Sequence, residues 1–530
     1  MVSEQSENYR TFFLEFFMNP DSYPDQTQFV HKIETHASYV FLTDRFVYKI
    51  KKNINLGFLD FSTIEKRKHF TNQELMLNQR LCSDIYIEVL PVWKNNNSFS
   101  FTKLEDGAIA EYALKMHRMS DEDFFLERLR LRRITESDIE EIALLLADFY
   151  KRQTVTPEII DWGCTTKLKI TTDENFEQTE AFINASISKP SFDLIRLYTD
   201  RFYQQQENLF QRRMEQGWIK NCHGDMHLEH FHKHRGAWCI FDCIEFNERF
   251  RYIDAACDIG FLLMDFDFNG RSDLALSLDE KLNQFLPDTD RKQMMDFYKC
   301  YRAYVRGKVD SMIAKNVREE QGKIQDAQRY FHLSLKYALI GSKPAAIVFM
   351  GRIATGKSRL SRRFSEETGI EIFSCDTIRK TMAGMMPTEQ TPDAKKKELY
   401  SEDFSDKTYR AVLDASLKSI RTGNSAVLDC TFSRKKYRDF IIENFQKHQI
   451  PYIFIETVVP DRIMKERLKK RSTGKDVISD ARIEDFEKIN SVFEKPDELS
   501  ENHYLQISTA GEKDETFFNL GKLLMEKQGN

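Results

Sequence analysis

The chain has 530 residues, of which 41% are hydrophobic and 30% charged, and its formal net charge is -5. This length exceeds what one hydrophobic core supports, so about two to four domains are expected. The slightly acidic balance argues against a surface dominated by nucleic-acid or membrane binding.

The sequence carries no membrane or export signal. The N-terminal residues are polar and acidic, without the apolar stretch of a signal peptide. No segment is apolar over the length that a bilayer requires. The nine cysteines include no CxxC pair, which predicts free thiols in a reducing compartment. We therefore expect a soluble, cytoplasmic protein with no membrane partner.

The first half begins with strands and continues with helices. The expected elements are a helix over 5–18, strands over 39–42 and 46–51, a helix over 63–81, strands over 85–93 and 108–116, and helices over 121–131, 137–152 and 175–217. Strands first and helices later predict an α+β domain with a small sheet lobe and a larger helical lobe.

Acids and histidines concentrate in the segment 221–247. It contains His223-Gly224-Asp225, His230 five positions after Asp225, and Asp242 at the end of an apolar run. An acid on a loop can accept the proton of a substrate hydroxyl. A second acid at a strand end can hold the Mg²⁺ ions that bridge the phosphates of ATP.

This half resembles the aminoglycoside phosphotransferases and small-molecule kinases, relatives of the protein kinases, whose catalytic loop reads H-G-D-x-x-x-x-N before a metal-binding Asp. The resemblance covers roughly residues 25–330 and implies a bilobal, protein-kinase-like fold. It implies that Asp225 is the catalytic base and Asp242 a metal ligand. It also implies that Lys49 binds phosphate with Glu74 as its helix partner, although Lys51 lies on the same strand face.

His230 departs from the family pattern, because it occupies the position of the Asn. Imidazole is a poorer Mg²⁺ ligand than a carboxamide oxygen. One possibility is that Asp242 is the main metal ligand, with Glu229 and Glu245 as nearby oxygen donors. The alternative is that this half has lost phosphoryl transfer. A zinc site among the histidines of 223–234 is a further alternative.

A Ser- and Pro-containing stretch over 340–344 separates the two halves. A helix is expected just before it, over 321–339, and a strand just after it. We therefore predict two domains, 1–342 and 343–530, joined by a linker short enough for the halves to touch.

The second half opens on a phosphate-binding loop. Residues 347–358 read IVFMGRIATGKS, which is G-x-x-x-x-G-K-S between an apolar strand and a helical stretch. Backbone N–H groups of such a turn point at phosphate, and the following helix adds its positive end. The residues expected to bind the phosphates are Gly351, Ala354, Thr355, Gly356, Lys357 and Ser358, with the Ser358 hydroxyl also ligating Mg²⁺.

Strands and helices alternate after this loop. The expected order is a helix over 357–368, a strand over 370–373, a helix from 377, a helix over 405–421, a strand over 425–428, a helix over 435–448 and a strand over 452–457. This alternation predicts an α/β domain with a parallel sheet, whose active groups lie at the carboxyl ends of the strands.

Candidate functional residues follow these strands. Asp429 is placed as the Mg²⁺ partner of Ser358, and Asp376 to orient or deprotonate an acceptor hydroxyl. Arg379 can bind an anionic part of that acceptor. Arg467 and Arg471, four apart on one helix, can neutralise charge on the transferring group. The alternatives are a helix N-cap for Asp376 and a solvated surface for the arginines.

The second half resembles the P-loop kinases that include polynucleotide 5′-kinases, gluconate kinases and zeta-toxin-like enzymes. In that group an Asp after the second strand activates the acceptor and lid arginines close over ATP, which implies these roles for Asp376, Arg379, Arg467 and Arg471. The whole chain resembles a bacterial fusion of an aminoglycoside-phosphotransferase-like domain with a P-loop ATP-binding domain, which names no substrate.

The preferred interpretation is a phosphotransferase with two ATP sites, each using Mg²⁺ and transferring the γ-phosphoryl group to a hydroxyl acceptor. A second interpretation makes the first half a nucleotide-sensing pseudokinase that regulates a P-loop ATPase or kinase. A third makes the second half a nucleic-acid repair enzyme that phosphorylates 5′-hydroxyl ends, motivated by lysine runs at 395–397, 435–436 and 469–470.

Overall fold

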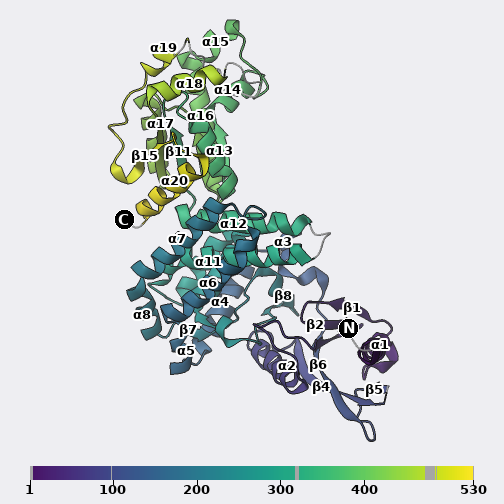
Figure 1. Cartoon of the computed structure of the whole chain (residues 1–530). Helices are drawn as coiled ribbons and strands as arrows, with labels where there is room; N and C mark the ends of the chain where they lie inside the picture. The colour runs from purple at the N-terminus through teal and green to yellow at the C-terminus, as the bar shows by residue number, and fades with distance from the viewer. Residues whose placement is uncertain (1–3, 97, 317–320, 472–483, 485, 529–530) are drawn as a thin grey trace. The chain divides into compact units, whose positions relative to one another are not determined.

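The computed structural model describes residues 4–96, 98–316, 321–471, 484 and 486–528 (Figure 1). The chain divides into two units. The first comprises residues 1–168, 208–265 and 274–291, and the second comprises 169–207, 266–273 and 292–530. This division does not coincide with the boundary at 342/343, which stays a prediction.

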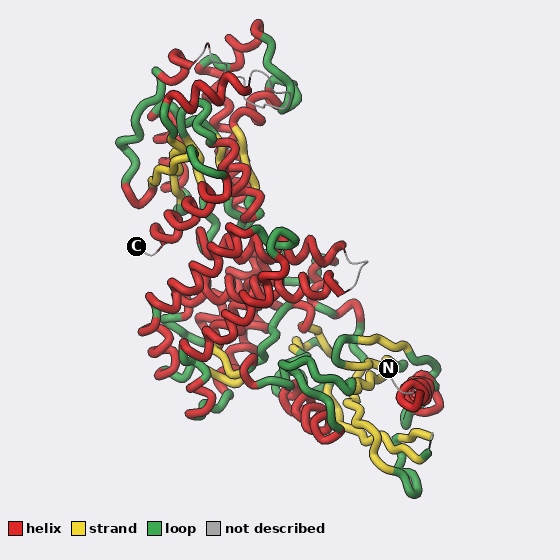
Figure 2. The backbone as a smooth tube through the Cα atoms, in the orientation of Figure 1, coloured by secondary structure: helices red, strands yellow, loops and turns green. Residues whose placement is uncertain are grey.

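The first unit contains a six-stranded antiparallel sheet, drawn in yellow near the N-terminus in Figure 2. Its strands are β1 (His31–Glu34), β2 (Ser38–Leu42), β3 (Phe46–Lys51), β4 (Tyr86–Asn95), β5 (Ser98–Ser100) and β6 (Ala108–His117), in the order β1-β2-β3-β6-β4-β5. The hairpin between β2 and β3 lies where the sequence predicted it, with Leu42 paired to Val47. The short strands β1 and β5 were not predicted.

Each face of this sheet is covered by one helix. Phe17 of α1 (Glu4–Met18) stacks on Phe41 of β2, with ring centroids 4.8 Å apart. On the other face, α2 (Ile64–Gln79) packs against β4 and β6. Because neighbouring strand residues point to opposite faces, the lysines of β3 face α2 and the large aromatic residues face α1.

The rest of the first unit is mostly helical, with two small two-stranded sheets around the acid- and histidine-rich segment. Its helices include α3 (Phe125–Arg130), α4 (Glu136–Arg152), α5 (Pro157–Asp161), α8 (Glu207–Glu215), and most of α9 (Ala255–Phe268) and α10 (Ser272–Phe285). One sheet pairs β7 (Ile219–Asn221) with β10 (Tyr252–Asp254), and the other is the hairpin of β8 (Phe231–His234) and β9 (Ala237–Ile240).

The single helix expected over 175–217 is wrong. The structure has α6 (Thr165–Thr179), α7 (Lys189–Gln205) and α8 in its place. The Ser188 hydroxyl accepts a hydrogen bond from the Ser191 N–H and caps α7, whose first turn contains Pro190. Ser followed closely by Pro is a helix-start signal, and it outweighed the continuous apolar pattern.

The second unit contains a five-stranded parallel sheet. Its strands are β11 (Ala346–Met350), β12 (Glu371–Ser374), β13 (Ala426–Asp429), β14 (Tyr452–Val458) and β15 (Tyr504–Ser508), in the order β12-β13-β11-β14-β15. All four pairings are parallel. The central strand β11 is buried along its whole length. The predicted fold class is confirmed, because an α+β half with an antiparallel sheet precedes an α/β half with a parallel sheet that leads into the phosphate loop.

Helices cover both faces of the parallel sheet. The helices of this part of the chain include α13 (Lys357–Thr368), α14 (Cys375–Met382), α15 (Asp393–Leu399), α16 (Glu402–Arg421), α17 (Lys435–Lys447), α18 (Asp461–Arg471), α19 (Phe486–Asn490) and α20 (Lys513–Gln528). Val348 packs with Leu413 of α16 and Ile441 of α17, whereas Phe349 points the other way and contacts Phe364 of α13.

The second unit also includes α7, α12 (Gln321–Ile340) and nearly all of α11 (Arg291–Asn316). The carboxylate of Glu367, near the end of α13, accepts hydrogen bonds from Ser188 and Ser191 at the start of α7, at 2.7 and 2.6 Å. The helix that follows the phosphate loop is therefore anchored at its far end by α7. Within the described residues, no helix combines the length and apolar character needed to cross a bilayer.

The expectation of nine free thiols is wrong for four of them. Cys82 is bonded to Cys239 and Cys375 to Cys430, with Cα atoms 4.8 and 5.1 Å apart. The partners are 157 and 55 residues apart in the chain, so no local spacing motif announced either pair. The remaining free cysteines are Cys164, Cys222, Cys243, Cys257 and Cys300.

Candidate active sites

The loop that carries Asp225 is held by a buried acid. Asp258 of α9 accepts hydrogen bonds from the N–H groups of His223 and Gly224, both at 2.9 Å, and from the Tyr150 hydroxyl at 3.0 Å. The carboxylate of Asp254, four residues earlier, pairs with Arg213, 2.6 Å away. Asp258 therefore holds the loop backbone immediately before Asp225 in place.

His223 connects this loop to the segment that bears Asp242. Its Nε2 donates to the Phe241 carbonyl at 2.9 Å, and its Nδ1 accepts from the Asp225 N–H at 3.3 Å. Burial lowers the pKa of His223 to about 3, so the ring is neutral, as this donor and acceptor pattern requires. The two predicted acids are thus linked through one buried imidazole.

Lys49 and Lys51 share the carboxylate of Glu74. The Lys49 Nζ lies 2.7 Å from one Glu74 oxygen and 2.8 Å from Asp242, whereas the Lys51 Nζ lies 2.6 Å from the other Glu74 oxygen and contacts Glu245. Burial works against the Lys49 charge, but Asp242 and Glu74 outweigh it and raise its pKa above the usual range. The contact with Asp242 favours Lys49 over Lys51 as the phosphate-binding lysine.

His230 stands between the two acids. Its Nδ1 donates to the Asp225 carbonyl at 2.9 Å, which leaves Nε2 to face Asp242 Oδ2 at 3.7 Å. Asp225, His227 and His230 also offer one ligand atom each within 4.8 Å of one another. Because this donor set mixes nitrogen with oxygen, it fits a divalent transition-metal ion better than Mg²⁺, which prefers oxygen ligands.

Gly224 offers a test of the loop's geometry. It has φ of +88°, and a Cβ there would lie 2.7 Å from the Phe250 carbonyl oxygen. Gly236 also has φ of +88°, but a Cβ there would meet nothing within 4 Å. Both alanine variants carry the backbone strain, roughly 1–2 kcal/mol. Only Gly224→Ala must also displace the backbone at Phe250. In urea denaturation, the free energy of unfolding of Gly224→Ala should therefore be at least about 1 kcal/mol lower than that of Gly236→Ala. Equal free energies of unfolding for the two variants would contradict the clash.

The phosphate loop has the curled backbone that its sequence predicts. Gly351 has φ of +144° and Gly356 of +93°, and Ala354 adopts φ of +60° without being a glycine. A Cβ on Gly351 would lie 2.8 Å from the Thr457 carbonyl oxygen. The Thr355 hydroxyl is 2.7 Å from the Thr457 hydroxyl. Thr457, which the sequence analysis missed, thus anchors the loop from β14.

Lys357, Ser358 and Asp429 form one cluster. The Lys357 ammonium pairs with Asp429 and lies 3.3 Å from the Ser358 Oγ, which in turn donates to Asp429 Oδ1 at 3.2 Å. The hydroxyl and carboxylate oxygens are the donor types that Mg²⁺ prefers. The predicted metal-binding residues of the second half therefore fit this ion.

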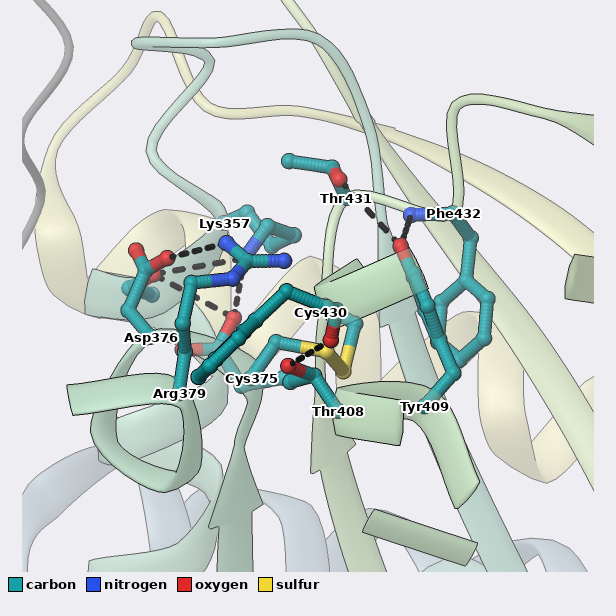
Figure 3. Close-up of a disulfide and its surroundings, with 12 residues drawn as sticks. Lys357, Cys375, Asp376, Arg379, Thr408, Tyr409, Cys430, Thr431 and Phe432 are labelled. Carbon is teal, nitrogen blue, oxygen red and sulfur yellow. Dashed lines mark hydrogen bonds and ion pairs between the residues drawn. A yellow bond between two sulfur atoms is a disulfide. The ribbon is translucent and has the colours of Figure 1, made fainter. Parts of the chain in front are cut away.

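Asp376 and Arg379 lie at the same edge of the sheet as this cluster. Ser374, the last residue of β12, pairs in register with Asp429, and Asp376 follows in the first turn of α14. The Arg379 Nη1 is 3.6 Å from Asp376 Oδ1, and Figure 3 shows both side chains grouped with Lys357. The Arg379 Nε is buried without a hydrogen-bond partner among the described residues.

Arg467 spans the phosphate loop and the end of β15. It donates to the Ala354 carbonyl at 3.3 Å and to the Thr509 carbonyl at 2.6 Å. A cleft of about 240 Å³ adjoins this contact, with a lining that includes Gly356, Arg359, Arg362, Thr509 and Lys513. Arg471 ends α18, and its side chain lies outside the part of the chain that the structure describes. Thr509 was not predicted.

Comparison with known proteins matches the second half to one family. Residues 347–496, which begin at the strand before the phosphate loop, match the profile of an AAA domain. Uncharacterized proteins of Mycobacterium tuberculosis and Mycobacterium bovis are 28% identical over 423 residues, which is 77% of this chain and 80% of each relative.

Two solved structures are similar to part of the chain. A gluconokinase from Sinorhizobium meliloti is 17% identical with a TM-score of 0.26, covering 34% of this chain and 93% of its own. A choline/ethanolamine kinase family protein from Mesorhizobium loti is 12% identical with a TM-score of 0.38, covering 68% of this chain and 98% of its own.

Proposed function

We propose that the chain is an ATP-dependent phosphotransferase with two nucleotide sites, one in residues 1–342 and one in 343–530. Each site would transfer the γ-phosphoryl group to a hydroxyl-bearing acceptor. The observation that carries the proposal is the cluster of Lys357, Ser358 and Asp429 at the mouth of a curled glycine loop. The first half has a similar set in Lys49, Glu74 and Asp242.

In the second half, the residues divide the work between nucleotide and acceptor. The loop from Gly351 to Ser358 binds the phosphates, and the cleft beside Thr509 receives the nucleoside. When bound, Mg²⁺ neutralises phosphate charge, and Ser358 and Asp429 would hold it. Asp376 accepts the proton of the acceptor hydroxyl. Arg379 binds an anionic group of the acceptor, while Arg467 and Arg471 offset charge on the transferring group.

In the first half, Asp225 is the proton acceptor and Lys49 the phosphate-binding group. Lys49 exchanges its contact with Asp242 for the phosphates when ATP enters, while Glu74 continues to hold it in place. Asp258 and His223 keep Asp225 oriented. His230 and Asp242 would hold the metal ion, whose identity is tested below.

The direct test is label transfer. The full-length chain is incubated with γ-labelled ATP and a cell extract, and the molecules that gain label are identified. Products that vanish in Lys357→Ala belong to the second half, and products that vanish in Asp225→Asn belong to the first. An extract that gains no label from the unaltered chain would contradict the proposal.

The position of His230 favours a second candidate function, in which the first half binds nucleotide without transferring phosphate. Its Nε2 faces Asp242 where a carboxamide oxygen would otherwise lie. In Lys357→Ala, which silences the second half, this alternative predicts ATP binding by calorimetry together with no labelled product. A product that depends on Asp225 would exclude it.

His230→Asn should change which metal supports nucleotide binding. The imidazole nitrogen favours later divalent ions over Mg²⁺, so in Lys357→Ala we expect ATP to bind at least about tenfold more tightly with Co²⁺ than with Mg²⁺. Asn restores an oxygen donor and should bring the two dissociation constants together. Calorimetric titration of ATP with each ion measures this, and His234→Asn, outside the cluster, is the control. An unchanged ratio would show that His230 is not a ligand.

The acceptor of the second half is proposed to be a small molecule. Lys435 and Lys436, which motivated a nucleic-acid end, form ion pairs with Asp439 and with Glu402 and Asp406, so part of their charge is already matched. A 5′-hydroxyl oligonucleotide that gains label, and does not in Asp376→Ala, would favour the nucleic-acid alternative.

A further inference from the structure

The bridge between Cys375 and Cys430 joins the two strand ends that carry the acids of the second half. Ser374 and Asp429 are the last paired residues of β12 and β13, and each cysteine is the first residue after its strand. Cys430 directly follows Asp429, and Cys375 directly precedes Asp376. Figure 3 shows the bridge beside Lys357, Asp376 and Arg379.

Each sulfur belongs to an element whose position matters for the site. Cys375 is the first residue of α14, which also carries Asp376 and Arg379. Cys430 begins the loop after β13, whose Phe432 N–H donates to the Tyr409 hydroxyl of α16 at 3.1 Å. The bridge therefore ties the start of α14 to a segment that is itself anchored in the core.

We propose that Cys375 and Cys430 form a redox modification site whose disulfide holds Asp376 and Arg379 in their working position. Its effect on turnover rests on the function proposed for the second half. Formation of the bridge, and the tethering of α14, do not depend on that function.

The bridge would form by exchange with a small disulfide such as oxidised glutathione. The Cys375 thiolate is favoured as the attacking group, because it lies at a helix N-terminus and is 5% exposed against 1% for Cys430. It attacks one sulfur of the oxidant and releases one glutathione thiolate. The Cys430 thiolate then attacks the Cys375 sulfur and releases the second. Two protein thiols are oxidised, two glutathione thiols are produced, and the two protons pass to them.

The other buried cysteines are poorer candidates for this chemistry. Burial raises the pKa of Cys243 to about 12 and that of Cys300 to about 12, so both remain protonated thiols. Cys82 and Cys239 form the second bridge, which lies in the first unit. That bridge provides a matched control, because its removal leaves the strand ends of the parallel sheet unchanged.

The strands β12 and β13 stay hydrogen-bonded without the bridge, so reduction should leave the phosphate loop intact and loosen only α14. A displacement of about 1 Å in a positioned group can cost about 100-fold in rate. We expect reduction to lower ATP turnover by about tenfold, with the dissociation constant for ATP changed less than about twofold.

The experiment equilibrates the full-length Asp225→Asn chain, in which the first half is silenced, in glutathione buffers of defined ratio. Differential alkylation with mass spectrometry reports the bridge, hydrogen exchange reports α14, and turnover and binding are measured with ATP itself. We expect oxidation to block alkylation of Cys375 and Cys430, slow amide exchange over 375–382 and raise turnover. Cys375→Ser and Cys430→Ser should have the turnover and amide exchange of the reduced chain, and neither quantity should change with the glutathione ratio.

The double variant Cys82→Ser/Cys239→Ser should keep the full response. Alkylation of Cys375 and Cys430 in the most oxidising buffer would overturn the proposal, because it would show that no bridge forms. So would a bridge that forms without changing hydrogen exchange over 375–382. If exchange responds but no ATP turnover occurs in any state, the redox site stands and the proposed phosphotransfer fails.

Discussion

On the proposed function, Asp225→Asn should lower the rate of phosphoryl transfer by the first half by about 10²- to 10⁴-fold, the contribution of a positioned general base. Asparagine keeps the shape of the side chain and cannot accept the acceptor's proton. The loop itself should persist, because Asp258 holds the backbone N–H groups of His223 and Gly224. The dissociation constant for ATP should therefore stay unchanged while the rate falls.

The measurement uses the Lys357→Ala background and the initial rate of label transfer to the acceptor that the extract identifies. Glu248→Gln, an exposed acid in the same unit, is the control and should transfer label at the unaltered rate. If Asp225→Asn lowers the rate by less than about threefold, the decrease is far smaller than the loss of a general base would cause. That result would exclude Asp225 as the proton acceptor.

Lys357→Ala should abolish most nucleotide turnover in the second half. The Lys357 ammonium lies beside Asp429 and the Ser358 hydroxyl at the mouth of the loop, where phosphate oxygens would replace the carboxylate. Loss of one such charged donor lowers the rate by about 10²- to 10³-fold. ATP should also bind more weakly, because the lysine contacts phosphate before and during transfer.

Turnover is measured in the Asp225→Asn background, so that the first half contributes no phosphoryl transfer. ATP binding by the second half is measured as the difference between this background and the same chain with Lys357→Ala added. Lys343→Ala removes an exposed lysine from the segment before β11 and should change neither quantity. If Lys357→Ala still binds and turns over ATP like Lys343→Ala, the turn from Gly351 to Ser358 does not bind the phosphate chain.

The sheets and the acids at their edges could be predicted from local signals. Strong apolar runs marked β11, β13 and β14, and the residues after β11 and β13 were candidate functional groups. The register between Ser374 and Asp429 shows why this worked, because parallel neighbours bring their carboxyl ends to one edge. The pairing of Lys49 with Glu74 was implied by the family resemblance of the first half and not by a local signal.

Contacts between residues far apart in the chain could not be predicted. Thr457 and Thr509 reach the phosphate loop from β14 and β15, but a threonine at a strand end is too common to stand out. The disulfide partners carried no spacing motif. The helix over 175–217 failed for a different reason, since Ser188 and Pro190 were a readable start signal that the apolar pattern obscured.

The placement of the strands distributes rigidity unevenly around the second site. β11, which leads into the phosphate loop, is the middle strand and is buried at every residue, whereas β12, which leads to Asp376, is an edge strand with partly exposed residues. Mutational drift at the edge disturbs few neighbours, while drift at the centre disturbs the whole layer. Over generations, such a scaffold can change the residues around Asp376 while the phosphate loop keeps its conformation.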